Sequence, residues 1–191
     1  MPRPPRISFP GAVYHVTARG NDRAAVVRDD FDRRCLSDAL AAVVGKFGWL
    51  CHAYCLMDNH YHLVVETPEA NISTGMQQLN GTYAQRFNQR HKRSGHLFQG
   101  RFHTVLVGDE GHLLEACRYV VLNPLRAGIC TRPAAWPWSS YRATAGFSSR
   151  PAFLTLTTIL SSFARDTANA VAAYRAFVDD VPPAQAGGGA R

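Results

Sequence analysis

The sequence predicts an α+β fold of the ferredoxin-like, split βαβ type, in which an antiparallel sheet carries its helices mainly on one face. Three observations support this fold class. Short segments alternate apolar and polar residues, as strands do, and two longer segments repeat apolar residues every three or four positions, as helices do. These segments follow the order strand, helix, strand, strand, helix, strand, which is the order of that fold.

The first half of this plan contains three strands and one helix. Residues 13–19, VYHVTAR, alternate and predict the first strand. A helix follows, with Asp29 or Asp30 as its N-cap and Gly48 at its end. Its apolar stripe consists of Phe31, Cys35, Leu36, Ala39, Leu40, Val43, Val44 and Phe47. Residues 49–56 and 60–67 predict two strands joined by a hairpin turn at MDN.

The second half contains two more helices and the last strand. A helix carries the apolar stripe Ile72, Met76, Leu79, Tyr83 and Phe87. After a loop at GHLFQGRF, residues 103–107 predict a fourth strand, and residues 110–122 predict a helix that Pro124 stops. Because the two helices of a split βαβ unit cover one face of the sheet, we expect the other face to stay open for function.

The chain is expected to have three regions. Residues 1–130 form the domain described above. Residues 131–181 form a C-terminal extension with helical pieces, which packs onto the domain through the tryptophans of RPAAWPWSSYRA. Residues 182–191, PPAQAGGGAR, have the composition of a flexible tail.

Composition limits the class of protein. The chain has 191 residues, of which 46% are hydrophobic and 18% charged, which predicts a globular protein with a real core. No apolar stretch is long enough to span a bilayer, and the N-terminus lacks the hydrophobic core of a secretory signal, so we expect a cytoplasmic protein. The five cysteines are an odd set in apolar segments, which favours reduced thiols over a disulfide framework.

The net charge of +7 is unevenly distributed along the chain. Residues 70–108 contain no Asp or Glu, and their cations alternate with phenylalanines. This pattern favours nucleic acid, because bases stack on aromatic rings while cations neutralise phosphates; the alternative is a solvated basic face. The candidate DNA-binding residues are Arg86, Arg90, Lys92, Arg93, Arg101 and Phe102, with Arg3 and Arg6 as further candidates.

The segment MDNHYHLVV places two histidines on one side of a strand. Strand parity puts His60, His62 and Val64 on one face, with Tyr61, Leu63 and Val65 on the other. Residues two apart on a strand have Cα atoms about 6.6 Å apart, and their imidazoles can converge on a metal ion. The alternatives are two histidines that only form hydrogen bonds, or a zinc site that also includes Cys51 and Cys55.

Among the seven tyrosines, Tyr119 is distinctive because its ring is not part of the apolar stripe of its own helix. It lies away from the apolar stripe and shares its face with Glu115 and Asn123, each four residues away. Its hydroxyl is therefore a candidate for chemistry, and packing under the extension is the alternative. Asn123 is a candidate third metal ligand through its amide oxygen, although an Asn before a proline can also cap a helix.

Three motifs together resemble the IS200-like tyrosine transposases, and within them the REP-associated tyrosine transposases. They are His60-Tyr61-His62, SGHLFQGRF at 94–102 and RYVVLNPLRAGI at 118–129. The resemblance spans about Pro10 to Tyr141 and implies a ferredoxin-like HUH domain over residues 1–130, acting on single-stranded DNA, often at hairpins. It implies metal binding by His60 and His62, nucleophilic attack by Tyr119 and a ligand role for Asn123. Tyr61 departs mildly from the bulky hydrophobic residue of the family motif.

The expected function is cleavage and strand transfer of single-stranded or hairpin, REP-like DNA through a 5′-phosphotyrosine. The resemblance and the amide and phosphate oxygens favour magnesium or manganese. We expect a monomer or homodimer with no membrane partner and no small-molecule cofactor. The alternatives are a non-cleaving module that binds structured DNA or RNA, a metal nuclease that uses water, and a zinc structural domain.

Overall fold

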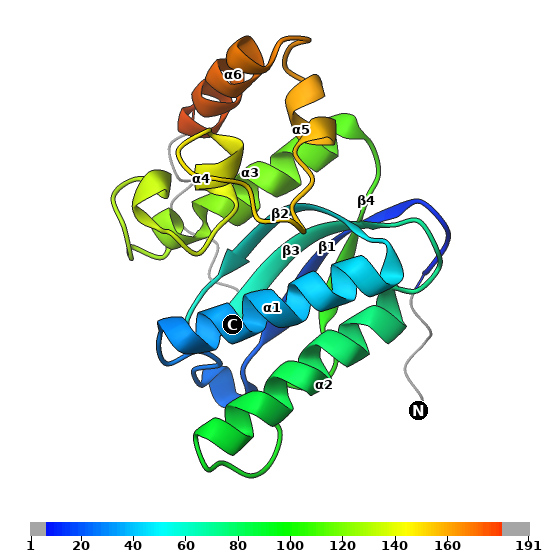
Figure 1. The fold of residues 1–191 in the computed structure, drawn as a ribbon, viewed down its shortest axis with the longest axis vertical. Coiled ribbons are helices and arrows are strands. Elements are labelled where there is room, and N and C mark those ends of the chain that lie inside the picture. The colour runs from blue at the N-terminus through cyan, green and yellow to red at the C-terminus, as the bar shows by residue number, and fades with distance from the viewer. Residues whose placement is uncertain (1–6, 181–191) are drawn as a thin grey trace, which may run out of the picture.

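The computed structural model describes residues 7–180, so Arg3, Arg6 and the predicted tail at 182–191 lie outside the described residues. The predicted α+β fold is confirmed (Figure 1). The strands are β1 (Ala12–Arg19), β2 (Leu50–Leu56), β3 (His60–Thr67) and β4 (His103–Val107). They form one sheet in the order β2-β3-β1-β4, and every neighbouring pair is antiparallel.

Two long helices, α1 (Asp30–Phe47) and α2 (Ile72–Arg90), cover one face of the sheet. Asp29 caps α1, because its side chain accepts a hydrogen bond from the Asp32 N–H. Gly48 ends the helix in the left-handed region at φ 65°, which glycine adopts without strain. Both ends of α1 therefore follow the sequence prediction. The apolar stripes of α1 and α2 meet the sheet in a buried core, except that Phe31 of the predicted stripe is 50% exposed.

The other face is partly covered, over β2 and β3, which corrects the sequence prediction of a fully open face. Helix α3 (Glu110–Arg126) packs on it and forms a second core with Ala53, Cys55 and Val64. Figure 1 shows α3 grouped with the later helices, away from α1 and α2. Those helices are α4 (Tyr141–Thr144), α5 (Thr157–Ser161) and α6 (Thr167–Asp179), and two 3-10 turns, η1 (Asn21–Arg23) and η2 (Pro133–Ala135), complete the fold.

Pro124 does not stop α3, which continues to Arg126. A proline inside a helix has no N–H to donate to the carbonyl four residues earlier. The amide nitrogen of Asn123 compensates, because it donates to the Tyr119 carbonyl at 2.9 Å and approaches the Val120 carbonyl at 3.5 Å. The helix therefore keeps its last turn, which the prediction placed outside it.

A β-bulge in β2 decides where its cysteines point. The pairing of β2 with β3 shifts register between Cys51 and Ala53, so strict alternation fails there. Cys51 joins the core under α1 and α2, whereas Cys55 joins the core under α3. Burial also raises the pKa of Cys51 to about 12, which keeps it a thiol. The alternative zinc site is wrong, because its two cysteines lie on opposite faces.

The segment after residue 130 covers the outer edge of β2. The Leu56 N–H donates to the Trp138 carbonyl, and the Ser140 N–H donates to the Tyr54 carbonyl. Farther along, the Thr155 N–H donates to the Cys51 carbonyl. These bonds pair backbone groups that an edge strand would otherwise leave exposed to a foreign strand.

Gly75 in α2 leaves room for the buried ring of Trp49, and Gly75→Ala is expected to destabilise the fold. An added Cβ would lie 2.1 Å from Trp49 Cζ2. Overpacking of this kind costs about 1–3 kcal/mol, and we expect a net loss of about 2 kcal/mol in the free energy of unfolding. Urea unfolding measures it.

Gly81→Ala is the matched control on the same helix, where an added Cβ meets nothing within 4 Å. Because Gly loses more backbone entropy than Ala in a helix, this variant should gain about 0.5–1 kcal/mol. Equal effects at the two positions would contradict the packing described at Trp49.

Candidate active site

The two histidines of β3 lie on the face that α3 covers. Strand parity sends Tyr61, Leu63 and Val65 into the core under α1 and α2, and Val64 into the second core, as the alternation predicts. The ring centroids of His60 and His62 are 4.9 Å apart, and the rings are nearly perpendicular. The strand therefore brings both imidazoles to one place beside α3.

Strand β1 adds two residues that the sequence analysis missed. The register pairs Thr17 with His62, which places His15 beside the same ring. His15 Nε2 lies 3.0 Å and Thr17 Oγ1 lies 3.1 Å from His62 Nδ1. The available signal was the alternation of His15, Thr17 and Arg19 on one side of VYHVTAR, but only the register shows which partner strand they face.

Tyr119 reaches this group from α3. Its ring centroid lies 5.9 Å from that of His62 and 5.5 Å from that of His15. The side chain is 42% exposed, and the guanidinium of Arg126 lies 4.8 Å from its ring centroid. The neighbouring Arg118 contacts α6 instead, donating to the Phe177 carbonyl. Tyr119 is therefore available at the surface beside His62, and is not packed under the extension.

A cavity of about 460 Å³ opens in front of His62 and Tyr119. Its lining includes two arginines and two further histidines but no carboxylate, so it suits an anionic group such as a phosphate. The lining residues are His15, Thr17, Arg19, His62, Gln99, Arg101, His103, Val105 and Tyr119. A smaller hollow of about 290 Å³, next to Glu115 and Arg126, reaches Tyr119 from the side of α3.

Burial favours the neutral form of His15, His60 and His62. Burial, helped by the nearby His60, His15 and Arg19, lowers the pKa of His62 to about 3. Burial also lowers the pKa of His60 and of His15. A metal ligand must present a free nitrogen lone pair, and a neutral imidazole provides one without first losing a proton.

The lowered pKa of His62 makes the stability of the fold depend on pH. Below pH 6.5 the unfolded chain binds a proton at this residue that the folded chain takes up only near pH 3. The contribution of His62 to the free energy of unfolding is therefore greatest above pH 6.5 and falls as the pH drops toward 3. At pH 4.5 the loss from this group is about 3 kcal/mol.

Chemical unfolding at pH 7 and pH 4.5 measures this dependence. His62→Gln should reduce the difference between the two pH values, whereas the same change at the exposed His96 should leave it unchanged. An undiminished difference in His62→Gln would contradict the assignment of this pH dependence to His62.

The candidate ligands His60, His62 and Asn123 offer imidazole nitrogens and an amide oxygen, which are donor types that divalent cations accept, although the set is small. Within residues 7–180 no three His, Cys, Asp or Glu side chains are grouped as a metal site. Both His60 and His62 have polar neighbours at Nδ1, which leaves Nε2 for a metal. The amide nitrogen of Asn123 is engaged by its own helix, so only its Oδ1 remains as a ligand. Two imidazoles and one amide oxygen would hold such an ion with positions left for phosphate oxygens.

Of the six candidate DNA-binding residues, Arg101 alone lines the cavity beside His62 and Tyr119. Arg86 and Arg90 line a different hollow between α1 and α2. Lys92 and Arg93 follow the end of α2, and the guanidinium of Arg93 lies over the ring of Phe87. Phe102 is 9% exposed and belongs to the core under α1 and α2, so its ring is not offered to a base as the prediction assumed.

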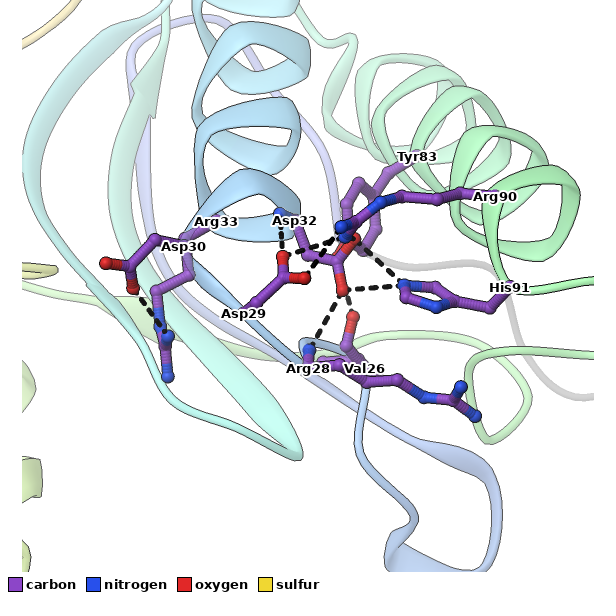
Figure 2. Close-up of polar contacts among 9 residues, drawn as sticks. All are labelled: Val26, Arg28, Asp29, Asp30, Asp32, Arg33, Tyr83, Arg90 and His91. Carbon is purple, nitrogen blue, oxygen red and sulfur yellow. Dashed lines mark hydrogen bonds and ion pairs between the residues drawn. The ribbon is translucent and has the colours of Figure 1, made fainter.

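Arg90 belongs to a buried charge cluster centred on Asp32 (Figure 2). Figure 2 shows the Asp32 carboxylate between the start of α1 and the end of α2. It accepts hydrogen bonds from Arg90 at 2.5 Å and from the Arg28 N–H at 2.9 Å, and its other close neighbour is His91 at 2.8 Å. Arg90 also pairs with Asp29 at 2.7 Å. Its charge is therefore balanced by two acids within the fold.

Within residues 7–180, no helix has the length and apolar character to cross a membrane.

Comparisons with known proteins identify the family. Residues 8–123 match the family Transposase IS200 like. The chain is 24% identical over 135 residues to the "Putative REP-associated tyrosine transposase" of Haemophilus influenzae, covering 61% of this chain and 76% of that protein. A solved structure of a REP-associated tyrosine transposase bound to a REP hairpin shares the fold, with a TM-score of 0.66, 17% identity, and coverage of 81% of this chain and 92% of that one. The family match covers more than half of the chain, so this protein belongs to the IS200-like transposases.

Proposed function

We propose that this protein cleaves single-stranded DNA beside a REP-like hairpin and transfers the strand through a 5′-phosphotyrosine at Tyr119. The observation that carries the proposal is the edge contact between the exposed Tyr119 ring and the His62 ring, at 5.9 Å between centroids, on a carboxylate-free cavity. Family membership supports this chemistry, and a structural neighbour binds a REP hairpin.

The side chains in and around the cavity have distinct tasks in this mechanism. Arg19 and Arg101 bind the phosphates of the strand, because both line the cavity. His60, His62 and the Oδ1 of Asn123 are the ligands that would hold a magnesium or manganese ion. Such an ion, when bound, polarises a non-bridging phosphate oxygen and orients the scissile bond.

Tyr119 supplies the nucleophile. Its phenolic oxygen bonds to phosphorus and gives up its proton, while the bond from phosphorus to the 3′ oxygen breaks and that oxygen leaves as a hydroxyl. The downstream strand remains linked to Tyr119 through its 5′ phosphate. Attack by another 3′-hydroxyl reverses the step and joins new ends. Arg126 lies against the ring of Tyr119 and limits its freedom before the attack.

A single-stranded substrate follows from the in-line geometry of this step. A duplex would hold the backbone away from the cavity and keep its bases stacked, whereas an unpaired strand can turn its phosphate toward Tyr119. The hairpin would serve as the recognised element beside this strand.

Covalent trapping tests the proposal. The full chain is incubated with a hairpin that carries single-stranded flanks, in manganese, with a label at either DNA end. We expect a protease-sensitive adduct that retains the label at the 3′ end and releases the 5′-labelled fragment. Chelation should abolish the adduct and leave the circular dichroism spectrum unchanged. Hairpin binding without any adduct would instead favour the non-cleaving binding module.

A further inference from the structure

Asn59, which directly precedes His60, forms two side-chain contacts. Its Oδ1 lies 2.6 Å from His60 Nδ1, and its Nδ2 donates to the Arg23 carbonyl at 3.3 Å. Asn59 belongs to the turn between β2 and β3, and Arg23 is the last residue of η1, which follows β1. One amide therefore connects the histidine to a backbone group from a different part of the chain.

The Arg23 carbonyl determines the direction of both hydrogen bonds. A carbonyl oxygen only accepts, so the amide nitrogen of Asn59 must face it, and the amide oxygen must face His60. That amide oxygen also only accepts, so His60 Nδ1 must carry the proton. In a neutral imidazole the other nitrogen, Nε2, then holds the free lone pair.

The backbone around this amide is held independently of the side chain. The Gly20 N–H donates to the Asn59 carbonyl at 2.8 Å, and the Val26 N–H donates to the Asp58 carbonyl at 2.8 Å. Gly20 is tightly enclosed, because an added Cβ would lie 2.0 Å from the Ala24 carbonyl oxygen. The Arg23 carbonyl is thus presented by a loop with a defined conformation, and shortening the Asn59 side chain leaves these bonds in place.

We propose that Asn59 is a positioning residue, which holds His60 in the Nδ1-protonated tautomer and so turns its Nε2 lone pair toward the cation. The inference rests on the proposed function for the identity of that cation, but not for the tautomer. Partners of this kind orient metal-binding histidines, and their loss typically weakens metal affinity by about 10- to 100-fold.

Histidine tautomers observed by 15N NMR test the proposal in the metal-free, full-length protein. The signals of His60 are assigned by comparison with His60→Gln. We expect the Nδ1-protonated form in the wild type and a shift toward the Nε2-protonated form in Asn59→Ala. Asn59→Asp should retain the Nδ1-protonated form, because a carboxylate oxygen still accepts from Nδ1.

Asp58→Ala is the matched control in the same turn, because the Asp58 side chain pairs with Arg33. It should leave the His60 tautomer unchanged. An Nε2-protonated His60 in the wild type, or an unchanged tautomer in Asn59→Ala, would overturn the proposal.

Titration with manganese alone gives a second measurement. We expect the Kd for manganese to rise about 10- to 100-fold in Asn59→Ala and to stay near or below the wild-type value in Asn59→Asp. Equal affinity of Asn59→Ala and wild type would overturn the orienting role. A wild type that shows the expected tautomer but binds no manganese and forms no DNA adduct would defeat the proposed function while leaving the tautomer assignment standing.

Discussion

Tyr119→Phe is expected to eliminate the covalent protein–DNA adduct, with a loss on the order of 1,000-fold or more, because it removes the only atom proposed to bond to phosphorus. The substitution keeps the ring that contacts His62 and His15, so the fold and the hairpin affinity should be nearly unchanged. Denaturing gels measure the adduct, and gel-shift titration of the labelled hairpin measures binding.

Tyr54→Phe is the matched control for the loss of a phenol. Tyr54 is buried in the core under α1 and α2, on the side of the sheet opposite Tyr119, and should keep wild-type adduct formation. An adduct that persists in Tyr119→Phe would show that another residue is the nucleophile, and peptide mapping of the adduct would then identify it.

Asp32→Ala is expected to lower the free energy of unfolding by about 3 kcal/mol. The carboxylate is almost fully buried, and its loss leaves Arg90 and His91 without their shared partner. It also removes the acceptor of the Arg28 N–H, at the point where the chain enters α1. Urea unfolding at neutral pH measures the change.

Asp30→Ala is the appropriate control, because Asp30 is largely exposed and pairs with Arg33 across one helical turn. Exposed pairs of this kind contribute at most about 1 kcal/mol. Similar losses in the two variants would contradict the central role given to Asp32.

Arg90 is a candidate for DNA binding and also pairs with Asp32 inside the fold. Two variants distinguish these roles. If Arg90 serves the fold, Arg90→Ala should reduce stability while hairpin affinity, measured where the variant is folded, stays close to that of the wild type. Arg101→Ala should do the reverse, since Arg101 lines the cavity and Arg90 does not. Each lost phosphate contact should also reduce the salt dependence of hairpin binding.

The sequence was enough to predict most of the helices and strands, because their patterns depend on residues that are close together in the chain. Side-chain periodicity alone placed α1, α2 and the four strands, because periods of 3.6 and 2 reflect which face of an element is buried. The caps of α1 at Asp29 and Gly48 followed from local hydrogen bonding and backbone freedom. Parity on β3 separated the histidines from Tyr61, since an unbroken strand alternates strictly.

Predictions failed where a side-chain hydrogen bond, a strand pairing or a distant ion pair overrides the local pattern. Pro124 stays inside α3, where the Asn123 side chain donates to carbonyls of the preceding turn. The bulge at Cys51 reverses the parity of β2, and only its pairing with β3 reveals it. The basic stretch from 70 to 108 looked unbalanced because the acids that pair with Arg90 lie about sixty residues earlier.

The sequence by itself determined the main elements and indicated His60, His62 and Tyr119 as candidate site residues, because the side-chain pattern and the motifs that contain these residues are local properties of the chain. Only the tertiary structure decided that α3 covers the second face, that His15 and Thr17 join His62, and that Arg101 enters the site while Arg90 does not. Strand register and helix docking set these contacts, and both depend on burying surfaces that are far apart in the chain.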